Sequence, residues 1–65
     1  MFTKEGFNKL IAGAGLTKEK LAKHLGISPV TLHRKINDSG NFDRNEIIKM
    51  TEVLDKSETL SLFFE

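Results

Sequence analysis

The chain has 65 residues, of which 38% are hydrophobic and 29% charged, a composition ordinary for one soluble globular domain. It contains no cysteine, which excludes disulfides and thiolate metal sites and fits a reducing compartment. Its apolar stretches are far shorter than the ~20 residues of a membrane span, and its first residues lack the apolar centre of a signal peptide. We therefore expect one domain over residues 1–65 that needs no cofactor, metal or membrane.

The charged residues are distributed unevenly, although the net charge is only +1. Residues 1–37 carry seven basic and two acidic side chains, a net charge of +5, whereas residues 38–65 carry three basic and seven acidic side chains, a net charge of −4. A basic half beside an acidic half can favour a polyanion on one face. A generic solvated surface explains the charges equally well, so charge alone leaves both interpretations open.

Apolar residues recur at helical spacing along the chain, and no segment alternates with a period of two. The first predicted helix spans about residues 4–12, and its apolar residues share one face. They are Phe7, Leu10, Ile11 and Ala14. Gly13 and Gly15 follow, and glycine is suited to end a helix because it adopts the left-handed conformation readily.

The second and third predicted helices each begin at a hydroxyl residue. Thr17 and Ser28 can accept hydrogen bonds from the free backbone N–H groups of the first turn. Pro29 occupies the first position of the third helix, where its missing N–H costs nothing. Gly26 ends the second helix and lets the chain reverse direction without a Cβ clash. The residues expected to face the core are Leu21, Ala22, Leu25, Leu32 and Ile36.

A fourth helix is predicted after Asp43, which forms a capping box with Glu46. Its buried stripe is expected to contain Ile47, Met50, Val53 and Leu54. A fifth helix begins at about Asp55 or Ser57 and carries Leu60, Phe63 and Phe64. The fold class is therefore all-α, a bundle of five short helices joined by brief turns.

Residues 18–37 read KEKLAKHLGISPVTLHRKIN, two short helices separated by a turn that contains glycine. This is the arrangement of a helix-turn-helix, whose second helix is presented to the DNA major groove. The segment, placed at about residues 17–36, resembles the helix-turn-helix of the lambda-repressor-like (Cro/CI-type, XRE) family. The following NFDRNEIIKMTEVLDKSETLSLFF resembles the fourth and fifth helices of small phage and prophage members.

The resemblance implies a phage-type transcriptional regulator, a repressor or a Cro-like protein, in the cytoplasm of a bacterial host and associated with the nucleoid. Its partner would be a double-stranded DNA operator, bound by a homodimer in many family members. Arg34 would contact a base, since its guanidinium fork suits guanine O6 and N7, and Lys18 would contact phosphate at a helix N-terminus. The complete expected DNA-binding set is Thr17, Lys18, Ser28, Pro29, Val30, Thr31, His33, Arg34, Lys35 and Asn37.

The sequence departs from the family pattern at the start of the third helix. Pro29 and Val30 stand where family members often carry Gln, Arg or Ser, and neither side chain reads a base by hydrogen bonds, although Val30 could touch a thymine methyl. An antirepressor-like modulator that binds a cognate phage repressor protein is therefore the alternative. Its interface would use the apolar tail of Leu62, Phe63 and Phe64.

The two histidines offer little chemistry of their own. His24 and His33 do not share one helix face, and no cysteine or carboxylate pair completes a metal site around either. Ser28 and His33 lack a third group that would orient them as nucleophile and base. We expect neither an enzyme nor a metal protein, with His24 solvated or partly packed.

Overall fold

Each helix begins at a residue whose side-chain oxygen accepts a backbone hydrogen bond, and these caps divide the chain into its elements. The computed structural model describes residues 1–65. The helices are α1 (Lys4–Gly13), α2 (Lys18–Leu25), α3 (Pro29–Asn37), α4 (Arg44–Val53) and α5 (Lys56–Phe64). The chain forms no strand, so the all-α prediction is confirmed. None of the helices has the length and apolar character needed to cross a membrane.

The predicted caps are present. Thr17 and Ser28 each accept a hydrogen bond from the backbone N–H three residues later, at 3.2 and 3.1 Å. Asp43 accepts from the backbone N–H of Glu46 at 2.8 Å, and the Glu46 carboxylate accepts from the backbone N–H of Asp43 at 2.9 Å, which completes the capping box. These local bonds explain why the second, third and fourth helices begin where they do.

One cluster of twelve buried apolar residues forms the core, and α1–α4 contribute to it at helical spacing. Phe7, Leu21, Leu32 and Met50 are fully buried. Phe7 also lies in an aromatic cluster whose ring centroids are 5.4–6.2 Å apart. The expectation for Ala14 is wrong: this residue is exposed, because α1 ends at Gly13 and the chain turns away there.

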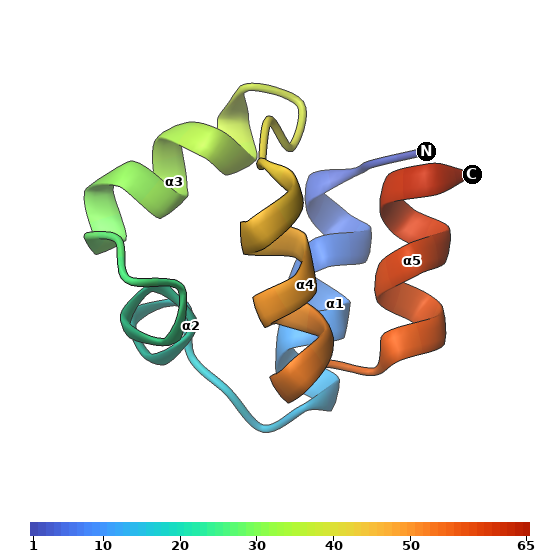
Figure 1. Cartoon of the computed structure of the whole chain (residues 1–65), viewed down its shortest axis with the longest axis horizontal. Coiled ribbons are helices and arrows are strands. Elements are labelled where there is room, and N and C mark those ends of the chain that lie inside the picture. Colours follow the sequence, from blue (N-terminus) through green and yellow to red (C-terminus); the bar gives the residue numbers. More distant parts are fainter.

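The arrangement of the helices leaves α3 at the edge of the molecule (Figure 1). α4 packs against α2 on one side and α5 on the other, and α5 also packs against α1. α3 packs mainly on α2, and the two ends of the chain lie together on the opposite side, beside α1 and α5. One side of α3 is therefore free of the rest of the protein.

Candidate nucleic-acid interface

The turn between α2 and α3 determines how α3 is held. Gly26 adopts φ 77° and ψ 25°, in the left-handed region that favours glycine. The backbone N–H of Ile27 donates to the carbonyl of Ala22 at 3.0 Å, which closes the end of α2. Ala22 itself is fully buried, and its small side chain allows α3 to cross close to α2. The predicted helix-turn-helix geometry is therefore present.

α3 has a buried side and an exposed side. Leu32 and Ile36 are buried in the core. On the other side, four residues at spacing i, i+3, i+4 and i+7 form one stripe, and all four are exposed. They are Val30, His33, Arg34 and Asn37, and we call them the recognition face. Arg34 makes no ion pair with the rest of the chain, so its five N–H donors point into solvent.

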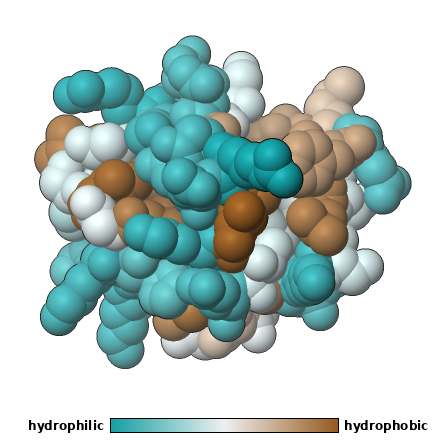
Figure 2. Space-filling view, viewed as in Figure 1, coloured by the Kyte–Doolittle hydropathy of each residue, from teal (hydrophilic) through white to brown (hydrophobic).

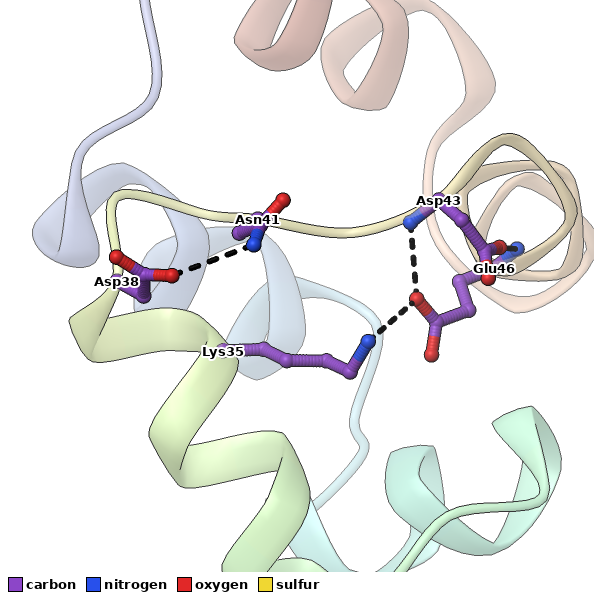
Figure 3. A network of polar contacts seen from close by, with 5 residues as sticks. All are labelled: Lys35, Asp38, Asn41, Asp43 and Glu46. Carbon is purple, nitrogen blue, oxygen red and sulfur yellow. Dashed lines mark hydrogen bonds and ion pairs between the residues drawn. The ribbon is translucent and has the colours of Figure 1, made fainter.

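Lys35 belongs to a different part of the structure from the recognition face. Its Nζ lies 3.0 Å from Oε1 of Glu46, and the same oxygen accepts from the backbone N–H of Asp43 (Figure 3). The side chain of Lys35 is half-buried, and that of Glu46 is nearly buried. Lys35 was expected among the DNA contacts, but the structure directs its charge toward α4. Its role is to join the end of α3 to the start of α4 across the loop.

The residues at the start of α3 are largely committed to the cap. The hydroxyl of Ser28 accepts from the backbone N–H of Thr31 at 3.1 Å and donates to the Thr31 hydroxyl at 2.9 Å. Pro29 and Val30 are exposed next to them. The end of α3 that would enter a groove first therefore offers a compact, uncharged surface, with 68% of Val30 accessible to solvent.

The start of α2 offers a second polar surface. Thr17 and Lys18 are exposed there, and so are Lys20 and Lys23 further along the helix. None of the three lysines forms an ion pair. A helix N-terminus combines free N–H groups with the positive end of the helix dipole, so phosphate is the anion best suited to this surface.

A family model described as helix-turn-helix matches residues 9–60, which is most of the chain and includes all of α2, α3 and α4. The chain belongs to the lambda-repressor-like (XRE) helix-turn-helix family. This confirms the resemblance seen in residues 18–37. Helix-turn-helix domains of this family are DNA-binding regulatory domains and are generally not enzymes. No curated protein and no solved structure matches the chain.

The three apolar residues at the end of α5, which were expected to form a protein interface, are not all exposed. Leu62 and Phe63 are half-buried and pack against the core, where the ring centroid of Phe63 lies 5.4 Å from that of Phe2. Only Phe64 of the three expected interface residues is exposed. The helical repeat explains this outcome, since Phe64 shares its face with Leu60, whereas Phe63 shares its face with the fully buried Thr59.

His24 joins two helices of the domain instead of forming a site of its own. Its Nε2 lies 3.0 Å from Oε1 of Glu52, which connects α2 to α4. No three His, Cys, Asp or Glu side chains come together in a way that could hold a metal ion. Sequence inspection missed both this contact and the pair of Lys35 with Glu46, because neither pair has the i, i+4 spacing of a local helical contact.

Proposed function

We propose that this helix-turn-helix domain is a phage-type transcriptional regulator, a repressor or a Cro-like protein, that places α3 in the major groove of a DNA operator. The observation that carries the proposal is the recognition face, whose four residues are exposed while the opposite side of α3 is buried. The major groove of B-DNA is ~12 Å wide and admits an α-helix. Occupying an operator in this way would block or redirect transcription.

The side chains of the recognition face would have different roles in the groove. Arg34 would donate two hydrogen bonds to guanine O6 and N7, and Asn37 would pair with adenine N6 and N7 or with a phosphate. His33 would donate to a base or a phosphate, and Val30 would contact a thymine methyl. Thr17 and Lys18 at the start of α2 would hold the adjacent phosphates.

The second candidate is an antirepressor-like modulator that binds a cognate phage repressor protein. It is supported by the exposed Pro29 and Val30, which read no base by hydrogen bonds and suit a protein partner better than most residues at the start of a recognition helix. The basic, unpaired side chains of α2 and Arg34 favour DNA, because Lys and Arg neutralise phosphates, whereas lysine is depleted at protein interfaces.

Binding to duplex DNA across a salt series separates the two candidates. A DNA regulator releases counterions when it binds, so its affinity should fall steeply with salt, with a slope of about −0.9 for each phosphate contacted. Arg34→Ala should weaken binding to a selected operator duplex by about 1–3 kcal/mol. Lys49→Ala removes the same charge from an exposed residue of α4, away from the recognition face, and should bind almost normally.

Two results would overturn the DNA proposal. One is the absence of detectable binding of the unmodified chain to any duplex at low salt. The other is an Arg34→Ala variant that keeps full DNA affinity but loses its contact with a repressor protein. The second result would establish the modulator instead.

A further inference from the structure

A surface of the molecule apart from α3 is apolar and exposed. Ile48 is 50% exposed, Leu60 38% and Phe64 67%. These three residues line one groove of about 370 Å³ between α4 and α5, which we call the α4–α5 groove. Figure 2 shows apolar surface over these two helices on the face turned toward the viewer. Single exposed apolar residues are ordinary, but a contiguous group marks an interaction site.

The α4–α5 groove carries a positive charge at each end. The charged residues that line it are Arg44 and Lys56, and neither forms an ion pair within the chain. Each is the first residue of its helix, and α4 and α5 run side by side in opposite directions (Figure 1). The two cations therefore lie at opposite ends of the groove, and the apolar side chains lie between them.

The length of α5 determines which partner fits between the two cations. This helix has nine residues, so its first and last residues are about 12 Å apart along the axis. A partner helix laid along the groove presents its residues i and i+7 on one face, about 10 Å apart, with residues i+3 and i+4 between them. Carboxylates at i and i+7 and apolar side chains at i+3 and i+4 would therefore match the groove.

We propose that the α4–α5 groove binds an acidic amphipathic helix of another protein. The apolar side chains of that helix cover Ile48, Leu60 and Phe64, and its carboxylates pair with Arg44 and Lys56. Because a cation lies at each end of the groove, the helix can bind in either direction. A basic helix would place like charges against each other at both ends, so charge selects the partner.

A helix in the α4–α5 groove leaves the DNA-binding surface free. No residue of α2 or α3 lines the groove. The groove also differs from the apolar tail expected from the sequence, because Leu62 and Phe63 pack against the core and do not line it. The inference therefore goes beyond the proposed function and does not depend on it. One chain can hold a partner helix while its recognition face is occupied.

A synthetic peptide tests the chemistry of the partner. The probe is an alanine-rich helical peptide of about 20 residues with Glu at i and i+7 and Leu at i+3 and i+4. Fluorescence anisotropy with the full chain at low salt measures its dissociation constant. The same peptide with Lys in place of both Glu residues should bind at least about 10-fold more weakly, because like charges then meet. A peptide with Ala in place of both Leu residues should lose measurable binding, because the apolar contact is removed.

A charge reversal in the groove tests the two cations directly. Arg44→Glu combined with Lys56→Glu should reverse the preference, so that the Lys peptide binds at least about 10-fold more tightly than the Glu peptide. Folding is not at risk, since both residues are exposed and a carboxylate is favourable in the first turn of a helix. Lys4→Glu combined with Lys49→Glu makes the same change in charge at exposed residues outside the groove, and this control should keep the preference for the Glu peptide.

The position of the peptide is measured by NMR of the ¹⁵N-labelled chain. We expect the Glu peptide to shift the backbone amides of Ile48, Leu60 and Phe64, and shifts confined to other helices would overturn the proposal. Failure of the Glu peptide to bind, equal binding of the Glu and Lys peptides, or a control variant that also reverses the preference would overturn it as well. So would a chain that associates with itself through the groove and excludes the peptide, which sedimentation equilibrium detects.

These outcomes are distinct from those that test the proposed function. A chain that binds the Glu peptide but no DNA duplex contradicts only the proposed function. A chain that binds a duplex but not the Glu peptide contradicts only the inference about the α4–α5 groove.

Discussion

Two neighbouring basic residues of α3, Arg34 and Lys35, have opposite surroundings. Arg34 is exposed and unpaired, whereas Lys35 turns back to Glu46 at 3.0 Å and lies with its Nζ 5.9 Å from the ring centroid of Phe42. A rotation of 100° along the helix is enough to turn one charge from the recognition face toward α4. The charge of a residue therefore does not predict its role without the helical phase.

Because Lys35 pairs with Glu46, a substitution of Lys35 should change the stability of the chain without changing how it binds DNA. Lys35→Met leaves the nearly buried Glu46 carboxylate with fewer partners, so the free energy of unfolding should fall by about 1–3 kcal/mol. The salt dependence of DNA binding should not change, because we expect the Nζ of Lys35 to stay paired with Glu46 instead of contacting a phosphate. Urea denaturation and a salt titration by fluorescence anisotropy measure the two effects. The control is Lys49→Met, which should leave the free energy of unfolding nearly unchanged.

A reduced salt slope in Lys35→Met, with stability unaffected, would contradict this assignment. It would return Lys35 to the phosphate contacts that the family resemblance implies.

The five helices show which structural features are local and which are not. The starts at Thr17, Ser28 and Asp43 were predictable, because a cap and the N–H groups it satisfies are only three residues apart. The sequence did not predict which face of α5 is exposed, because this depends on how the helix is rotated against α1 and α4. Phe63 and Phe64 are equally apolar in the sequence, yet one joins the aromatic cluster and the other faces solvent.

The left-handed conformation of Gly26, in the turn between α2 and α3, leads to a prediction about stability. Gly26→Ala should lower the free energy of unfolding by about 1–2 kcal/mol, because an alanine is strained at φ 77°. A Cβ at this position would meet no other atom within 4 Å, so the cost is that of the backbone alone. Thermal or urea denaturation measures the loss.

Gly13→Ala is the matched control for Gly26→Ala. Gly13 lies at the end of α1 with helical backbone and equally open space around it, so alanine there should stabilise the chain by up to about 1 kcal/mol. If both variants changed stability in the same direction and by the same amount, the left-handed conformation of Gly26 would not be what holds the turn.

At the scale of the whole molecule, basic and acidic residues are concentrated in different helices. The basic first half of the sequence contains α2 and α3, and the acidic second half contains α4 and α5. The uneven charge seen in the sequence thus becomes a difference between two regions of the fold. Caps and periodicity predicted the helix-turn-helix, and the family resemblance placed all four residues of the recognition face among the expected DNA contacts. The sequence did not predict that Ile48 and Leu60 are exposed, because their exposure depends on how α4 and α5 pack against each other.

The central claim is that the exposed side of α3 enters the DNA duplex. The most direct measurement is an NMR titration of the ¹⁵N-labelled chain with a selected operator duplex, followed at each backbone amide. We expect the largest shifts at Val30, His33, Arg34 and Asn37, with a second group at the start of α2. Shifts confined to α4 and α5, with the amides of α3 unchanged while DNA is bound, would contradict the claim.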